Sequence, residues 1–228
     1  MLCWRAPGHW PLAEAPPARV PEDPHYYIAG YSAADDPYCQ PNGVLVNLLG
    51  LSNTADLSEI EAELSALEID ELLRQAPPDA FSVAHLQHLH HQIFRHVYPW
   101  AGQFRQVDIA KGDTHFVPHL HIADRLEHLF NKACVRSCFK AMNTADFAQA
   151  AAAFLVELNL IHPFREGNGR TQRVLVSQMA QRAGLQMGWS GISEARMRQA
   201  CIAGLQGEAQ PMAKLFKVYL SPLPGALV

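Results

Sequence analysis

Twelve consecutive residues constrain the fold and the chemistry of this 228-residue chain more than any other stretch. Residues 162–173 read His-Pro-Phe-Arg-Glu-Gly-Asn-Gly-Arg-Thr-Gln-Arg. Apolar residues at helical spacing precede and follow them, which predicts a loop between two helices. Gly167 and Gly169 allow backbone conformations with φ > 0 that turn successive N–H groups toward one point. The stretch therefore predicts an anion-binding loop at a helix N-terminus, where the macrodipole also favours negative charge.

The side chains of this stretch suit a nucleotide polyphosphate. If the chain is helical from Arg170 onward, Arg170 and Arg173 share one face, and each presents a planar donor fork to phosphate oxygens. Glu166 is placed to hold the Mg²⁺ that a nucleotide brings. His162 is the nearby group that can deprotonate a hydroxyl near neutral pH. A lone Gly-Asn-Gly is an ordinary turn, and a pair of arginines is usually part of a solvated helix face. Their occurrence together, in this order and beside His162 and Glu166, predicts a nucleotide-binding site.

The same stretch resembles the signature of the Fic family, His-x-Phe-x-Asp/Glu-Gly-Asn-Gly-Arg-x-x-Arg, with every fixed position filled. Residues 97–105, Val-Tyr-Pro-Trp-Ala-Gly-Gln-Phe-Arg, resemble the family stretch Val-Tyr-x-Trp-Ala-Gly-x-x-Arg, and residues 107–116 resemble the family's flap. The resemblance covers roughly residues 38–222. It implies an all-α Fic-type helical core with a small β-hairpin flap. It also implies transfer of AMP from ATP to a Tyr, Ser or Thr hydroxyl of a target protein.

Gly169 refines this expectation, because Fic relatives that act as kinases replace this glycine with lysine, and retention of glycine favours AMP transfer. The resemblance implies that His162 is the general base, that Glu166 binds Mg²⁺ and that Phe164 anchors the loop in the core. It implies nucleotide contacts from the following residues: Lys111, Gly112, Asp113, Thr114, Gly167, Asn168, Gly169, Arg170, Arg173 and, for adenine, Gln199.

The flap has its own signal in the sequence. Residues 103–118 read as two short extended runs around a turn at Lys111-Gly112-Asp113, since Gln-Val-Asp-Ile alternates and Gly and Asp are turn residues. Alone this would be an ordinary surface hairpin. Beside the anion-binding loop it is expected to pair with the backbone of the target protein by β-augmentation.

Cap and stop residues predict the helices of the chain. They predict helices from about Thr54 to before Pro77, from Ser82 to Pro99, over residues 122–130, from Asn143 to His162, from Arg170 to Gly184, from Ser193 to Leu205 and from Pro211 to Leu220. In the first helix, Leu57, Ile60, Leu64, Leu67 and Leu72 are expected on the inner face. Glu59, Glu61, Glu63 and Glu68 are expected on a solvated face.

Composition excludes several function classes. The net charge is −4 and basic residues do not cluster, which argues against direct nucleic acid binding. No apolar run approaches the ~20 residues that span a bilayer, so no membrane contact is expected. Five scattered cysteines suit a reducing compartment, and a cytoplasmic location is expected. Residues 1–37 are expected to form a flexible Pro-rich extension, and residues 38–228 the Fic domain.

Fic enzymes are commonly inhibited by a helix of pattern Ser/Thr-x-x-x-Glu-Gly/Asn, whose carboxylate pairs with the second signature arginine, here Arg173. In this chain Ser190 and Glu194 have the spacing, but Ala195 follows. The resemblance therefore implies a toxin restrained by a separate small antitoxin protein. In resembling bacterial toxins the target is the ATPase subunit of DNA gyrase or topoisomerase IV.

Other readings stay open at the level of sequence. The chain could be a catalytically silent module that binds a nucleotide and a partner, or a Fic enzyme that transfers another phosphate-linked group. The twelve histidines could suggest a transition-metal site, but no His-Glu-x-x-His motif or paired cysteines accompany them. Surface positions or stacking roles are favoured for these histidines.

Overall fold

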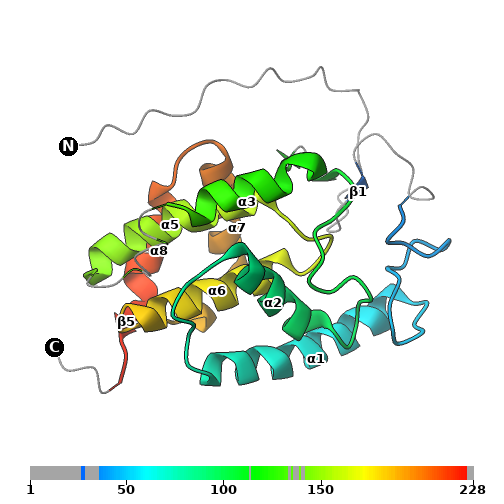
Figure 1. Cartoon of the computed structure of the whole chain (residues 1–228), viewed down its shortest axis with the longest axis horizontal. Coiled ribbons are helices and arrows are strands. Elements are labelled where there is room, and N and C mark those ends of the chain that lie inside the picture. Colours follow the sequence, from blue (N-terminus) through cyan, green and yellow to red (C-terminus); the bar gives the residue numbers. More distant parts are fainter. Residues whose placement is uncertain are drawn as a thin grey trace.

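The computed structural model describes residues 27–28, 36–112, 114–132, 135, 139 and 142–224. It is mostly helical, as predicted (Figure 1). Its α-helices are α1 (Thr54–Arg74), α2 (Val83–Phe94), α3 (Ile122–Phe130), α5 (Thr144–Ile161), α6 (Asn168–Arg182), α7 (Glu194–Leu205) and α8 (Gln210–Tyr219). The short elements are β1 (Tyr27–Ile28), β2 (Ile109–Lys111), β3 (Thr114–His115), β4 (Leu185–Met187), β5 (Leu220–Pro222) and the 3₁₀ turns η2 (His119–His121) and η3 (Trp189–Gly191).

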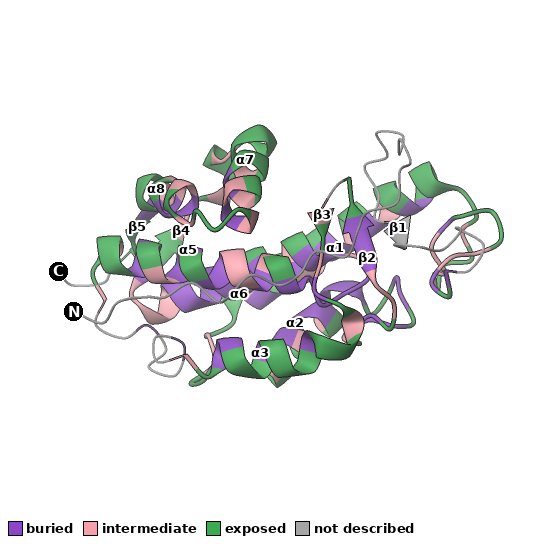
Figure 2. Cartoon of the chain, turned by 90° about the horizontal axis from the view of Figure 1, so that it is seen from above, coloured by how far each residue is buried: buried purple, intermediate pink, exposed green. Residues whose placement is uncertain are grey.

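Helices α5 and α6 form the centre of the fold. Helix α5 contacts α3, α6, α7 and α8, and helix α6 contacts α1, α2, α5 and β4. Figure 2 shows the buried residues concentrated along these two helices, with exposed faces on the surrounding ones. The predicted inner residues of α5 are all buried: Phe147, Phe154, Leu155, Leu158 and Ile161. The loop of residues 162–173, called the signature loop below, joins the two central helices.

The length and apolar character of α5 follow from this central position. Its 18 residues reach a mean hydropathy of 1.2, enough by length and composition alone to cross a membrane. A helix that is covered by four other helices has the same composition, because apolar residues must fill every face that lies in the core. The composition of α5 is therefore explained by its place in the fold.

Several helices begin at the predicted caps. The Ser82 hydroxyl accepts a hydrogen bond from the N–H of His85. Helix α1 begins at Thr54, as predicted, and its cap, which was not predicted, is Asn53, whose side chain accepts from the N–H groups of Ala55 and Asp56. Asn143 caps α5 in the same way. Gly184, with φ of 76°, follows the last turn of α6. Helix α2 is shorter than predicted and ends at Phe94.

The inner face of α1 differs from the prediction. Leu57 and Leu72 are buried, but Leu67 is 70% exposed, and the buried residues between the two leucines are Glu61 and Ser65. The prediction of Glu61 on a solvated face is therefore wrong. The reason is a distant partner, because this face of α1 packs against α6, where Arg170 meets the Glu61 carboxylate.

The predicted hairpin is present and short. Strands β2 and β3 pair antiparallel, with Lys111 opposite Thr114, and Gly112 in the turn has φ of 56°. Asp113 lies outside the described residues. Strand β1 pairs with the other edge of β2, and β4 pairs with β5, neither of which was predicted.

Most of the predicted N-terminal extension, residues 1–26 and 29–35, lies outside the described residues. Two of its parts that are described contact the domain. Strand β1 joins the flap sheet, and the buried Asp36 side chain accepts hydrogen bonds from Arg165 of the signature loop, at 2.7 Å from Nη2.

Candidate active site

His162 lies at the C-terminal end of α5, as predicted, in the left-handed region with φ of 49°. Its side chain is held on two sides. Nδ1 lies 3.0 Å from the carbonyl oxygen of Asn159, one turn earlier. The ring of Phe116, which follows β3, stacks on the imidazole at a centroid distance of 3.9 Å. The imidazole is therefore positioned jointly by the end of a core helix and by the flap.

These contacts define the protonation state of His162. A carbonyl oxygen only accepts, so Nδ1 carries the proton and Nε2 is the basic nitrogen. Burial lowers the pKa of His162 to about 3; the charges of Arg105 and Lys111 act in the same direction, and the Asn159 contact opposes them. His162 is therefore neutral near pH 7, the state that a general base requires.

The signature loop turns at Gly167. This residue has φ of 80° and caps α6, and a Cβ atom there would lie 2.3 Å from the Phe94 ring. The first helical hydrogen bond runs from the Thr171 N–H to the Gly167 carbonyl oxygen, at 3.1 Å. The N–H groups of residues 168–170 precede it and have no acceptor within the helix. The loop thus has the geometry of an anion site at a helix N-terminus.

Asn168 closes the loop with its side chain. Oδ1 accepts from the Phe164 N–H at 3.0 Å, and Nδ2 donates to the Phe164 carbonyl oxygen at 2.7 Å. The Asn168 side chain is buried, so its polar atoms serve the loop itself, and only its backbone N–H remains to bind an anion. Phe164 is 1% exposed, which confirms that it anchors the loop in the core.

His90 on α2 also fixes the loop, and sequence reasoning missed it. Its Nδ1 accepts from the Gly102 N–H at 2.8 Å, so its Nε2 carries the proton that goes to the Glu166 carbonyl oxygen at 3.0 Å. The Phe164 ring stacks on it at 3.8 Å. Burial lowers the pKa of His90 to about 3. His90 is a neutral structural link between the signature loop and residues 97–105.

The two signature arginines have different surroundings. Arg170 turns toward α1, where Nη2 contacts the Glu61 carboxylate and Nη1 donates to the Ser65 hydroxyl at 3.1 Å, and its guanidinium lies 4.7 Å above the Phe94 ring. Arg173 instead lines a cavity, and burial lowers its pKa. The structure thus separates Arg173, which faces the cavity, from Arg170, which joins two helices.

The cavity has a volume of about 610 Å³ and lies between the flap and α7. His162, Arg173 and the flap residues Lys111, Gly112 and Thr114 line it, together with Phe116 and Asn159. Its α7 side is formed by Glu194, Met197, Arg198, Cys201, Ile202 and Leu205. Gln199 is exposed on α7 and is not among the lining residues, so the structure does not bring it together with His162 and Arg173.

Glu166 fits the requirement for Mg²⁺. Its side chain is 24% exposed at the turn of the loop, and Oε1 accepts from the Gly167 N–H at 2.8 Å. Arg170 Nη2 is 3.9 Å from the same oxygen. Mg²⁺ in nucleotide sites is usually bound by one or two carboxylates together with phosphate oxygens, and Glu166 supplies one such carboxylate beside the anion site.

Comparisons with known proteins agree with this geometry. The sequence profile of the Fic/DOC family matches residues 80–180. A probable protein adenylyltransferase of Sinorhizobium fredii, y4lH, is 36% identical over 185 residues, which cover 80% of this chain and 95% of that protein. The protein adenylyltransferase VbhT of Bartonella schoenbuchensis is 32% identical over 82% of this chain, which spans 39% of that longer protein.

A similar fold is found in a crystal structure of BepC from Bartonella tribocorum with bound AMPPNP. The TM-score is 0.76 at 27% identity, and the match covers 82% of this chain and 97% of that one. The filled signature, the flap and the extent of the match to y4lH lead to one conclusion. The chain belongs to the Fic/DOC family.

Proposed function

We propose that this protein transfers AMP from ATP to a hydroxyl group of a target protein. The observation that carries the proposal is a neutral His162 on the wall of a cavity that also holds Arg173 and the flap, beside the N-terminus of α6. Its similarity to proteins named adenylyltransferases, and to a structure with bound AMPPNP, supports the same chemistry.

In this mechanism the hydroxyl oxygen of the target attacks the α-phosphorus of ATP. Nε2 of His162 accepts the hydroxyl proton, a bond forms between that oxygen and the α-phosphorus, and the bond from the α-phosphorus to the oxygen that bridges to the β-phosphorus breaks. Pyrophosphate leaves. The N–H groups of residues 168–170 and the Arg173 guanidinium stabilise the negative charge that moves onto it. Glu166 would hold Mg²⁺, which supplies further charge neutralisation at the phosphates.

The first test uses purified protein, a bacterial lysate and ATP radiolabelled at the α-phosphate. Label should enter protein, and His162→Ala should lower the rate by roughly 10²–10⁴-fold, the usual range for loss of a general base. His88→Ala is the matched control, because His88 is exposed on α2 and is not part of the cavity. Full labelling by His162→Ala would overturn the role of His162. A parallel reaction uses ATP radiolabelled at the γ-phosphate. Entry of that label into protein would indicate phosphate transfer instead of AMP transfer.

We further propose that the protein is a cytoplasmic toxin restrained by a separate antitoxin. In the candidate inhibitory segment Ser193 caps α7, and Glu194 lies in its first turn and contacts Arg198 at 2.5 Å. These positions support the interpretation that Ser193 and Glu194 cap α7, rather than form an inhibitory helix. Expression alone should slow bacterial growth, and co-expression with an adjacent small open reading frame should restore growth and yield a heterodimer. A harmless chain whose activity rises in Glu194→Gly would instead locate the inhibitory carboxylate on α7.

For the target, we propose the ATPase subunit of DNA gyrase or topoisomerase IV, docked at the flap. The test is to incubate each purified subunit with the enzyme and α-labelled ATP and to map the modified residue by mass spectrometry. Label on a tyrosine of one subunit supports this target. Label in the lysate that is confined to other proteins overturns it.

A further inference from the structure

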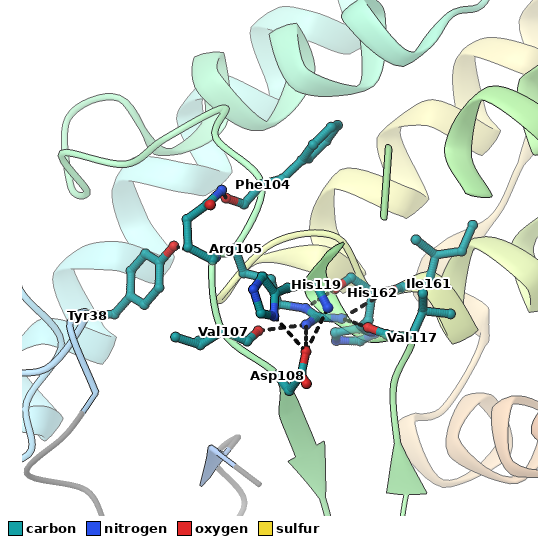
Figure 3. Close-up of polar contacts among 10 residues, drawn as sticks. Tyr38, Phe104, Arg105, Val107, Asp108, Val117, His119, Ile161 and His162 are labelled. Atoms are coloured by element: carbon teal, nitrogen blue, oxygen red, sulfur yellow. Dashed lines mark hydrogen bonds and ion pairs between the residues drawn. The ribbon is translucent and has the colours of Figure 1, made fainter. Parts of the chain in front are cut away.

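Arg105 is a buried cation that the mechanism above does not use. Its side chain is 1% exposed, and burial lowers its pKa to about 10, so it remains charged at neutral pH. The carboxylate of Asp108 lies 3.8 Å from Nη1, beyond hydrogen-bonding distance. The guanidinium is instead surrounded by backbone carbonyl oxygens, as Figure 3 shows. A buried charge with such partners can hold several chain segments together.

The first group of carbonyls belongs to His162, the proposed general base, and to its two neighbours in the chain. Arg105 Nε donates to the His162 carbonyl oxygen at 2.9 Å, and Nη2 donates to that of Ile161 at 3.2 Å. The backbone N–H of Arg105 donates to the Pro163 carbonyl oxygen at 2.9 Å. Arg105 thus binds three successive carbonyls at the C-terminus of α5, where helix carbonyls lack partners and carry partial negative charge.

The second group lies at the two ends of the flap, residues 107–116. Nη1 donates to the carbonyl oxygen of Val107 at 2.7 Å, and Nη2 also donates to that of Val117. The Val117 N–H in turn donates to the Leu160 carbonyl oxygen at 3.1 Å. One guanidinium therefore joins both ends of the hairpin to the backbone of the base. Between these ends lies Phe116, whose ring stacks on His162.

We propose that Arg105 is a positioning residue that sets the orientation of His162 relative to the flap. This inference rests on the proposed function, because it assumes that His162 accepts the proton of a target held by the flap. Lysine cannot replace arginine here. The three nitrogens of the guanidinium donate in different directions to carbonyls of separate segments, and the single ammonium nitrogen of lysine cannot reach all of them.

The test compares Arg105→Lys with Phe147→Leu. Phe147 is buried at the other end of α5 and is not part of the cavity, so its variant controls for lost stability. Arg105→Lys should lower kcat by roughly 10²-fold, the usual effect of a small misplacement of a catalytic group. It should change the KM for ATP and the calorimetric Kd for AMPPNP far less than kcat, because Arg173 and the N-terminus of α6 are not among the partners of Arg105. Phe147→Leu should keep its kcat. An unchanged kcat in Arg105→Lys, or a parallel loss of AMPPNP binding, would overturn the proposal.

Hydrogen exchange measured by mass spectrometry separates this inference from the proposed function. Arg105→Lys should accelerate amide exchange in residues 107–117 and 160–164 together, with α8 unchanged. Uniform acceleration along the chain, or acceleration in one segment alone, would contradict it. In the wild-type protein the two segments should open together with the same dependence on urea, which tests the link even if the variants do not fold. An enzyme that transfers no AMP but shows joint opening would refute only the proposed function.

Discussion

The Glu61 carboxylate of α1 accepts a hydrogen bond from the Arg170 guanidinium of α6, so the first signature arginine is held by a helix that lies outside the signature. Glu61 is 7% exposed, and burial raises its pKa in spite of the charge of Arg170. Desolvation therefore outweighs the attraction between the two groups. This balance is common in buried ion pairs, which often add less stability than their geometry suggests.

Glu61 variants should show this balance directly. Glu61→Gln should change the free energy of unfolding by less than about 1 kcal/mol, because an amide oxygen can still accept from Arg170 without a buried negative charge. Glu61→Ala should cost about 1–3 kcal/mol, because it removes the acceptor. Urea unfolding at pH 7 measures both values. Equal losses in the two variants would contradict the explanation by hydrogen bonding.

The two signature arginines should divide into a structural and a binding residue. Arg173→Gln should weaken AMPPNP binding by roughly 1.5–3 kcal/mol, the worth of a charge-assisted hydrogen bond, with little change in stability. Arg170→Gln should mainly lower the urea midpoint, because it separates α1 from α6. Calorimetry and urea unfolding on both variants test this division. It fails if both lose affinity equally and neither loses stability.

The two loop glycines should respond in opposite ways to an added methyl group. Gly167→Ala should destabilise the protein by about 2 kcal/mol or more, since φ is 80° and the new Cβ would clash with Phe94. At Gly169 the Cβ would lie 3.5 Å from Arg173 Nη1, an ordinary contact. Gly169→Ala should keep the urea midpoint and weaken AMPPNP binding, because its methyl group would occupy the anion site. Similar midpoints for the two variants would refute the steric argument.

The protein should become less stable as the pH is lowered, because two of its histidines are buried in the neutral form. The pKa values of His90 and His162 are about 3 in the folded protein, below the ordinary value of 6.5. Their contribution is therefore complete above pH 6.5 and is lost as the pH falls toward 3. His90→Gln removes one such group. It should reduce the slope of unfolding free energy by about 1.4 kcal/mol per pH unit between about pH 4 and 6. Urea unfolding across this range measures the slope, and equal slopes would show that His90 titrates normally.

Local signals in the sequence predicted most helix boundaries, because a cap forms between residues only two or three positions apart. The predicted caps Ser82, Asn143 and Ser193 each bind an N–H group within three residues of themselves. The position of His162 at the end of α5 followed from the same kind of signal. The structural roles of Glu61 and His90 could not be predicted in this way. Their partners are Arg170, 109 residues away, and the Glu166 carbonyl, 76 residues away.

The sequence contained one signal for the burial of Glu61, but the charge pattern of the helix outweighed it. Its spacing of four from Leu57 put it on the inner face of α1, but its charge and the neighbouring glutamates favoured solvent. The pairings of β1 with β2 and of β4 with β5 gave no signal, because strands of two or three residues are too short to show alternation.

The positions of the arginine partners bear on how small a working fragment of this protein can be. Arg165 and Arg170 lie within residues 80–180, which match the family profile, but their carboxylate partners Asp36 and Glu61 precede that range. The α7 wall of the cavity follows it. A fragment cut to residues 80–180 would leave Arg165 without Asp36 and Arg170 without Glu61, and it would leave the cavity open on the α7 side. We therefore expect residues 80–180 to contain the whole signature and still to lack a complete nucleotide site.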